Sequence, residues 1–257
     1  MFHNILNFFP VIIQAFIINI FYGNDYNRRK FIYANKLNIF LFIDRFNDLG
    51  KKILIDGIYE EQTLRIIQKY LKKDSIFFDV GANEGYFSLI SSKINYKGFN
   101  YLFEPQSRLS KIIKINHKKN YFKNFKLIKS ALGDNNYKKN LNLFPILNTG
   151  ASSFIQKYRF FSMKENVKII TLDEFLLKNP KIKKIDFIKI DVEGFEINVI
   201  KGMNSTLLNK KIKIILIDYH MNIISLKEKN RCEKTILSYG YKKIMEKYND
   251  YTLYKLH

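Results

Sequence analysis

Short apolar runs alternate with amphipathic stretches along most of this chain. The apolar runs have the length of buried strands and lie at 76–80, 100–103, 125–132, 185–190 and 212–217. Apolar residues recur with helical spacing around these runs, at 60–71, 86–94, 107–116 and 225–237. Strands buried on both faces are typical of parallel sheets. The pattern predicts an α/β fold, in which a doubly wound, mostly parallel sheet carries helices on both faces.

The two ends of the chain depart from this alternation. Residues 241–245 and 251–256 are expected to form a closing antiparallel hairpin, and 141–144 to begin a further β excursion. In the lead-in, 37–46 is predicted as a strand or short helix and 52–56 as a strand. With no internal repeat and no linker rich in Pro or Gly, we expect two parts: an N-terminal extension, 1–50, and one main domain, 51–257.

The opening segment is strongly apolar from Phe8 to Tyr22 but too short to span a membrane, which takes about 20 residues. It lacks the basic start and small-residue cleavage site of a secretory signal. We therefore expect a cytoplasmic protein whose first helix either packs on its own core or lies on a membrane surface. In the second case residues 1–30 make the peripheral contact, with Arg28, Arg29 and Lys30 facing phospholipid headgroups.

The formal net charge of +21 has three possible explanations. It is compatible with nucleic-acid binding, with attraction to anionic lipid or an acidic glycan, and with the Lys- and Asn-rich composition that an AT-rich genome produces. Lysines are spread along the chain rather than gathered in one motif, which does not favour nucleic acid. The single cysteine, Cys232, and four scattered histidines predict neither a disulfide framework nor a metal site.

The first strand ends in a glycine turn that reads DVGANEG, residues 79–85. This is neither the phosphate-binding loop nor the dinucleotide fingerprint, and Asp79 would repel a pyrophosphate. An acid there suits a ligand with an ammonium and a sulfonium group, which describes S-adenosylmethionine. Glu104 ends the second strand, where an acid can accept both ribose hydroxyls. Together Asp79 and Glu104 predict that this methyl donor is the cofactor.

Other donor contacts are expected at the same edge of the sheet, because ligands of open α/β folds bind at the carboxyl ends of the strands. The candidates are Gly81, Ala82, Asn83, Gly85, Tyr86, Pro105, Ala131, Leu132, Asp134 and Asp191.

A second group of polar residues offers a general base. Asp191 ends the fourth strand, Glu193 follows it, and His220 comes just after the fifth strand. An alcohol acceptor must lose a proton, so a base within hydrogen-bond reach helps. Asp191 and His220 are the first candidates, and Glu193 is the third. Glu193 and His220 can also have purely structural roles. Glu193 can stabilise the start of a helix, and His220 can be hydrogen-bonded in the core.

Several blocks, taken together, resemble the FkbM family of S-adenosylmethionine-dependent methyltransferases. They are FDVGANEGY (78–86), FEP (103–105), ALGD (131–134), TLD (171–173) and IKIDVEGFE (188–196), with Lys201 and Gly202 extending the last. The resemblance covers roughly 57–220. It implies a class I methyltransferase fold, Rossmann-like, with seven strands and a C-terminal antiparallel hairpin. Asp218 stands where the family often has Glu.

What the resemblance implies about function is O-methylation of a hydroxyl on a sugar, a glycan or a secondary metabolite. The partner would then be a small-molecule or glycan acceptor. Two other functions stay open: an RNA methyltransferase, although no base-flipping signature such as Asn-Pro-Pro-Tyr is present, and an inactive, binding-only relative. A dehydrogenase is disfavoured by the glycine spacing. The sequence leaves the oligomeric state open.

Overall fold

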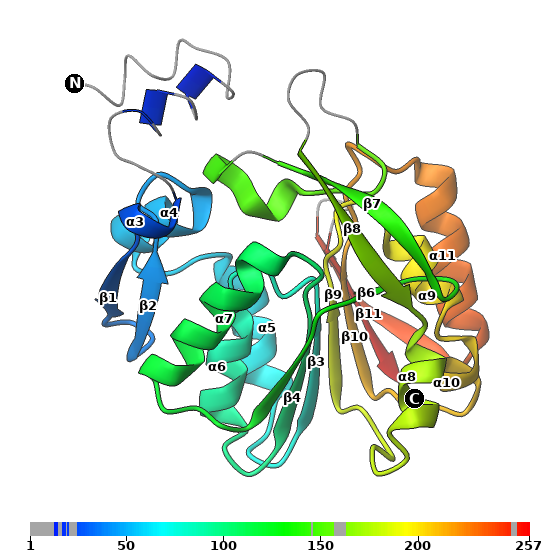
Figure 1. Ribbon diagram of the computed structural model, residues 1–257. Coiled ribbons are helices and arrows are strands. Elements are labelled where there is room, and N and C mark those ends of the chain that lie inside the picture. Colours follow the sequence, from blue (N-terminus) through cyan, green and yellow to red (C-terminus); the bar gives the residue numbers. More distant parts are fainter. Residues whose placement is uncertain are drawn as a thin grey trace.

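The computed structural model describes residues 13–14, 17–18, 20, 25–144, 146–156, 163–247 and 251–257 (Figure 1). Its main feature is a seven-stranded sheet with the order β11-β12-β10-β9-β3-β4-β5. The strands in chain order are β3 (Ile76–Val80), β4 (Phe99–Phe103), β5 (Phe125–Ile128), β9 (Phe187–Ile190), β10 (Ile214–Asp218), β11 (Tyr241–Lys247) and β12 (Tyr251–Leu256).

The five strands from β10 to β5 run parallel, and β12 and β11 close the sheet as an antiparallel hairpin. β3 lies at the centre, where Phe78 is paired with Tyr101 on one side and Ile188 on the other. The predicted fold, a doubly wound and mostly parallel sheet with a C-terminal hairpin, is confirmed.

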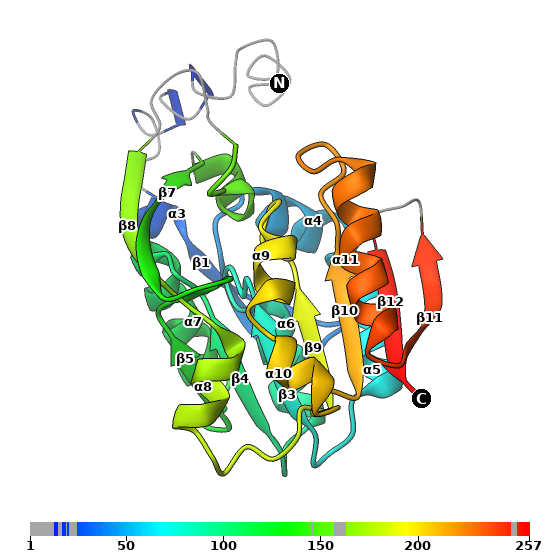
Figure 2. The ribbon, with the colours of Figure 1, turned by 90° about the vertical axis from the view of Figure 1, so that its right-hand side faces the viewer.

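Two helical layers cover the sheet because neighbouring residues of each strand point to opposite faces. Phe77 belongs to a buried cluster with α4 (Asp48–Asp56), α5 (Glu61–Tyr70) and α6 (Tyr86–Ile94). Phe78 belongs to the cluster on the other face of the sheet, which the helices of the C-terminal half cover (Figure 2). Those helices are α8 (Leu172–Lys178), α9 (Glu196–Lys201), α10 (Asn204–Leu208) and α11 (Leu226–Ser238). Ile113 of α7 (Ser107–Lys119) packs near β4.

The strand predicted at 52–56 is wrong, since these residues form the end of α4. The Asn47 side chain caps this helix by accepting a hydrogen bond from the Gly50 amide, and Gly57 ends it in the left-handed conformation. Leu49 and Ile53, four residues apart, are its buried apolar side chains. The apolar run 53–55 suggested a strand, but Ile55 is 80 % exposed, so the run does not mark a buried strand.

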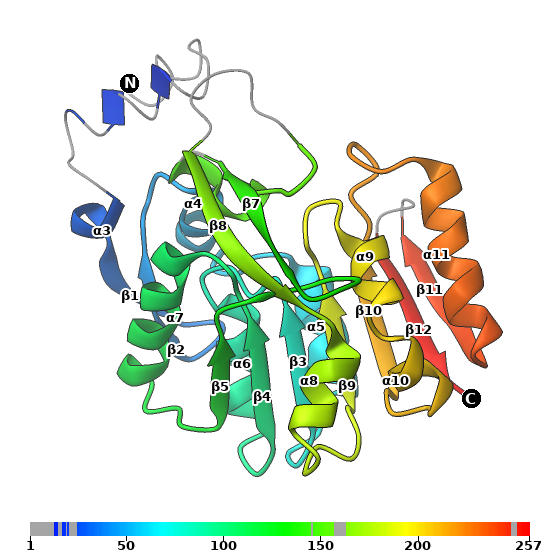
Figure 3. The same cartoon turned by 45° about the vertical axis from the view of Figure 1, so that its right-hand side comes forward.

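The single strand predicted at 125–132 is also wrong, because the chain divides it between two sheets. β5 ends at Ile128, and after a turn β6 (Ala131–Leu132) pairs with β8 (Met163–Ile170) in a three-stranded sheet that also contains β7 (Tyr137–Leu143). Figure 3 shows β7 and β8 as a long ribbon over the main sheet. The expected β excursion at 141–144 is part of β7.

The N-terminal part contributes α3 (Asp25–Arg28) and the antiparallel hairpin of β1 (Lys30–Ala34) and β2 (Ile39–Ile43). The alternative of a strand within 37–46 is therefore confirmed. One face of this hairpin shares a buried cluster with α4, α5 and α6. The first helix expected at residues 1–22 lies mostly outside the described residues. Among the residues that are described, no helix has the length and apolarity needed to cross a membrane.

Close packing between α9 and the turn after β6 gives a stability prediction. A Cβ on Gly202 would lie 1.8 Å from the carbonyl oxygen of Gly133, so the backbone must move to admit one. We expect Gly202→Ala to lower the free energy of unfolding by about 2 kcal/mol, the usual scale of overpacking. Urea denaturation measures this, with the exposed neighbour Lys201→Ala as control. Equal midpoints for the two variants would contradict the prediction.

Candidate functional site

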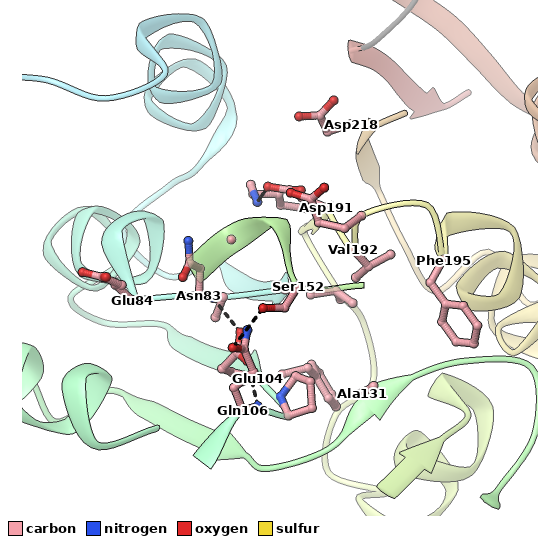
Figure 4. A pocket seen from close by; sticks show the side chains of 18 of the residues that line it. Asn83, Glu84, Glu104, Gln106, Ala131, Ser152, Asp191, Val192, Phe195 and Asp218 are labelled. Carbon is pink, nitrogen blue, oxygen red and sulfur yellow. Dashed lines mark hydrogen bonds and ion pairs between the residues drawn. The ribbon is translucent and has the colours of Figure 1, made fainter. Parts of the chain in front are cut away.

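A cavity of about 290 Å³ opens at the carboxyl ends of the central strands. Its walls come from the turn after β3, the segment after β4, β6, the ends of β9 and β10, and the 3₁₀ segment Ile146–Ala151. In Figure 4 Asp191 and Asp218 lie on one side of this cavity, and Glu104 and Gln106 on the other. The cavity is thus at the edge where the sequence predicts a ligand.

Most residues predicted as donor or catalytic contacts line this one cavity. They are Gly81, Ala82, Asn83, Tyr86, Glu104, Pro105, Ala131, Leu132, Asp191, Glu193 and His220. Three predicted donor contacts do not line it: Asp79, Gly85 and Asp134. Gly85 precedes α6 in the left-handed conformation, and Asp134 accepts a hydrogen bond from the Tyr137 hydroxyl outside the cavity. Their direct contact with a ligand stays a prediction.

The glycine turn touches the end of β9 directly. Gly81 has a φ of 82°, and a Cβ placed on it would lie 1.8 Å from the carbonyl oxygen of Asp191. Only glycine fits that conformation and that approach. The amides of Gly81 and Ala82 both donate to the carbonyl of Phe103, which ties the turn to β4 as well. The turn is therefore fixed between its two neighbouring strands.

Glu104 is held by the same turn. One of its carboxylate oxygens accepts a hydrogen bond of 2.8 Å from the backbone N–H of Asn83, and the other accepts one of 2.8 Å from the backbone N–H of Gln106. The residue is 3 % exposed, and burial raises the pKa of its carboxyl to about 8. Two backbone donors fix the position of the carboxylate before any ligand arrives, as a ribose-binding acid requires.

Asp79 lies beneath the cavity lining and is 1 % exposed. Neither of its carboxylate oxygens has a hydrogen-bond partner among the residues that the structure describes. Burial raises the pKa of Asp79 to about 6, although the Lys189 ammonium lowers it. A buried acid without a hydrogen-bonding partner favours a positively charged ligand group near it.

Lys189 and Asp191 form a buried ion pair at the end of β9, with 2.7 Å between Nζ and Oδ2. The ammonium also lies 5.1 Å from the centre of the Phe87 ring. Burial alone would lower the pKa of Lys189, but the nearby carboxylates raise it above its ordinary value. Burial likewise opposes ionisation of Asp191, yet Lys189 and His220 keep the pKa of its carboxyl below its usual range. Both groups are therefore charged at neutral pH.

His220 is surrounded by acids. Its Nδ1 lies 2.9 Å from Glu196 Oε1, and its Nε2 lies 3.3 Å from Glu193 Oε2 and 3.6 Å from Asp191 Oδ1. Burial would lower the pKa of the imidazole, but hydrogen bonds to Glu193 and Glu196 raise it to about 12. The ring is therefore an imidazolium at neutral pH and carries its proton already, which is the wrong state for a general base.

The same residues bring three metal-ligating atoms together. Ligand atoms of Asp191, Glu193 and His220 lie within 4.8 Å of one another. A cation between them would have to displace the imidazolium proton and compete with Lys189 for Asp191. The prediction that no metal is bound stays a prediction.

Sequence reasoning missed several residues that line the cavity. Glu60 precedes α5 in the left-handed conformation, with a φ of 43°, and burial raises the pKa of its carboxyl. Asp218 ends β10, and burial raises the pKa of its carboxyl to about 7. The other missed lining residues include Tyr59, Gln106, Asn148, Gly150, Ser152 and Phe154. Only Asp218 had a sequence signal, as a strand-end acid beside His220.

Glu84 connects the glycine turn to the N-terminal part of the chain. Its carboxylate accepts two hydrogen bonds from the Arg29 guanidinium, 2.6 and 2.7 Å long, and one of 2.5 Å from the Asn47 amide group. Asn116 of α7 also donates to the Glu84 carbonyl. The Arg29 side chain is fully buried, and Arg28 is buried against Asp44. Neither arginine therefore faces lipid headgroups as predicted.

The sheet order, the C-terminal hairpin, the glycine turn and the acid after β4 together define the class I methyltransferase fold. The sequence model of the methyltransferase FkbM domain matches residues 79–243, and the chain belongs to that family. The predicted resemblance is thereby confirmed, as is S-adenosylmethionine as the cofactor.

The chain is also similar to individual known proteins. Hexuronic acid methyltransferase AglP of Haloferax volcanii is 24 % identical over 168 residues, a match that spans 64 % of each chain. A Streptococcus mutans protein described as a candidate S-adenosylmethionine-dependent methyltransferase has a TM-score of 0.51 at 11 % identity, over 92 % of this chain and 57 % of that one. Aeropyrum pernix fibrillarin, in complex with natively bound S-adenosylmethionine, has a TM-score of 0.44 at 11 % identity, over 76 % and 74 %.

The residues present fit this donor. Gly81 lets the turn lie directly against the end of β9, Glu104 would hold the ribose hydroxyls, and the buried carboxylate of Asp79, which has no hydrogen-bond partner among the described residues, matches the positive charge of the donor. These roles rest on the chemistry of the donor set and stay predictions.

The buried Arg29–Glu84 pair gives a prediction about donor affinity. Glu84→Gln removes the charge that holds the turn, so we expect the dissociation constant of S-adenosylhomocysteine to rise about tenfold, as for loss of one charge-assisted bond. Titration calorimetry measures it. Asp44→Asn is the matched control, because Asp44 forms an equally buried pair with Arg28 away from the turn. An equal loss of affinity in both variants would contradict the prediction, because the effect would then come from the loss of any buried ion pair.

The raised pKa of Glu104 predicts a pH dependence. The ribose hydroxyls of the ligand bind the ionised carboxylate best, and ionisation of Glu104 becomes complete only above its pKa of about 8. Affinity for S-adenosylhomocysteine should therefore increase as the pH rises from about 6.5 to about 9 and then level off. Glu104→Gln cannot titrate, so its weaker affinity should be flat over this range. A wild-type affinity that is also flat would rule out control by Glu104.

Proposed function

We propose that this chain is an O-methyltransferase that acts on a hydroxyl of a sugar or glycan. The observation that carries this proposal is the ionised carboxylate of Asp191, which faces the cavity directly beside the glycine turn. S-adenosylmethionine, when bound, supplies a methyl group on a sulfonium leaving group. The residues of the chain then have to hold an acceptor oxygen in line with that methyl group, exclude water and remove the hydroxyl proton.

Asp191 is the base in this proposal. Lys189 holds one of its oxygens at 2.7 Å and leaves the other, Oδ1, directed to the His220 side of the cavity. An acceptor hydroxyl donates to this oxygen, which orients the acceptor and receives the proton as the new bond forms. His220, already protonated, serves as a positioning residue that keeps the carboxylates of Asp191 and Glu193 together.

The charges of the cavity favour a hydroxyl over a carboxylate as the acceptor. Six carboxyl groups line it: Glu60, Glu84, Glu104, Asp191, Glu193 and Asp218. The two cations, Lys189 and His220, are already paired with acids. Among the described residues of the cavity wall, an acceptor carboxylate would meet these acids with no unpaired cation to offset them, whereas sugar hydroxyls can donate to them. The match to a hexuronic acid methyltransferase supports an acceptor from the class of sugar-containing molecules.

Methyl transfer from labelled donor to glycans tests the proposal. With purified neutral oligosaccharides and glycolipids as acceptors, we expect Asp191→Asn to reduce turnover by about 100-fold or more, the usual contribution of a positioned base. Donor affinity should change by only about twofold, because the base acts on the acceptor. Asp74→Asn, an exposed acid at the opposite end of β3, is the control. Methylation of RNA in place of glycans, or full turnover in Asp191→Asn, would refute it.

A further inference from the structure

The hairpin of β1 and β2 has an outer face made of aromatic residues. Along β2 the side chains of Ile39, Leu41 and Ile43 point into the core. On the opposite face Phe31, Tyr33 and Phe40 are 44, 47 and 36 % exposed. The solvent side of an antiparallel hairpin is normally polar. Three exposed aromatic side chains on one such face therefore call for a binding explanation.

The rings form one continuous surface, which we call the aromatic face and define as Phe31, Tyr33, Phe40 and the half-buried Phe42. The ring centres of Phe31 and Phe42 are 4.9 Å apart, and those of Tyr33 and Phe40 are 5.0 Å apart. Tyr26, 53 % exposed, extends the surface with its ring 5.7 Å from Phe42. Figure 1 shows β1 and β2 at the outer side of the molecule, beside α7.

A lysine lies against the aromatic face. Nζ of Lys119, at the end of α7, lies 5.3 Å from the Phe31 ring centre and 4.9 Å from that of Phe40. Of the hairpin's own lysines, Lys30 alternates with Phe31 and lies on the opposite face, and Nζ of Lys36 donates to the Asp56 carbonyl of α4. The surface therefore combines rings that can enter an apolar layer with the Lys119 cation beside them.

We infer that the aromatic face docks this protein on an anionic lipid membrane. Aromatic rings at the level of the headgroups and lysines that attract anionic lipid are the two features by which proteins bind a membrane surface. The net charge of +21 has the sign this requires. The apolar stretch from Phe8 to Tyr22 also lies just before the hairpin in the sequence, so a second apolar element is close in the chain.

Single-stranded nucleic acid fits the aromatic face less well. Bases stack on open ring faces. Here Phe31 and Phe40 each have Lys119 over the ring, and each packs against a neighbouring ring at a tilted angle. Lys119 and the neighbouring rings therefore already occupy part of the ring faces on which a base would stack.

Vesicle flotation of the full chain tests the inference. Vesicles of phosphatidylglycerol and phosphatidylcholine in equal parts should bind the protein, and vesicles of phosphatidylcholine alone should not. The triple variant Phe31→Ser/Tyr33→Ser/Phe40→Ser should bind the anionic vesicles about tenfold more weakly, since it loses three inserted rings. Its affinity for S-adenosylhomocysteine should equal that of the wild type, which shows that it is folded.

The matched control removes three exposed apolar side chains elsewhere: Tyr96→Ser/Leu177→Ser/Leu208→Ser. It should bind the vesicles like the wild type. The inference is overturned if the wild type does not bind anionic vesicles, or if the aromatic triple variant binds them as well as the wild type or the control does. It is also overturned if the aromatic substitutions abolish RNA binding or self-association while vesicle binding is unchanged. These outcomes do not depend on whether the chain methylates a glycan.

Discussion

The contact between Gly81 and the carbonyl oxygen of Asp191 fixes the distance between the turn after β3 and the end of β9. The glycine turn and the acids that follow β9 can share one cavity because Gly81 has only a hydrogen atom between its Cα and the β9 backbone. The amides of the turn bind β4, which sets Glu104 on the opposite wall. Any side chain at Gly81 would push these walls apart. The site thus depends on backbone packing before it depends on the chemistry of any single side chain.

Charge balance is the second constraint on the site. Asp191, Glu193 and Glu196 surround His220, and Lys189 lies on the far side of Asp191. Buried carboxylates at this density are stable only with cations among them. The imidazolium and the ammonium meet that need and decide which acids are ionised. Asp191 stays charged, whereas burial raises the pKa of Asp218 to about 7. The same side of the cavity therefore offers a proton acceptor, Asp191, and a carboxyl group that can offer a proton, Asp218.

The sequence predicted the sheet well because buried parallel strands carry a strong local pattern, as at 76–80 and 187–190. It failed at 52–56, where Asn47 and Gly57 cap a helix whose apolar residues resemble a strand. It placed Asp191, Glu193 and His220 in one site because strand ends of an open sheet meet at one edge. Glu60 carries no such signal, since a left-handed residue before a helix brings it to the cavity. The Arg29–Glu84 pair joins positions 55 residues apart and has no local pattern.

That pair also bears on how the protein is assembled. The cavity is lined by residues from Leu49 to His220, and its turn is held by Arg29, so the donor site draws on chain segments separated by most of the sequence. Such non-local contacts form late, because closing long loops costs entropy before any contact is gained. A partly folded chain that lacks these contacts lacks the complete donor site. Ligand binding should therefore stabilise the whole domain as a unit rather than one part of it, and the cellular donor concentration becomes a determinant of how much folded protein persists.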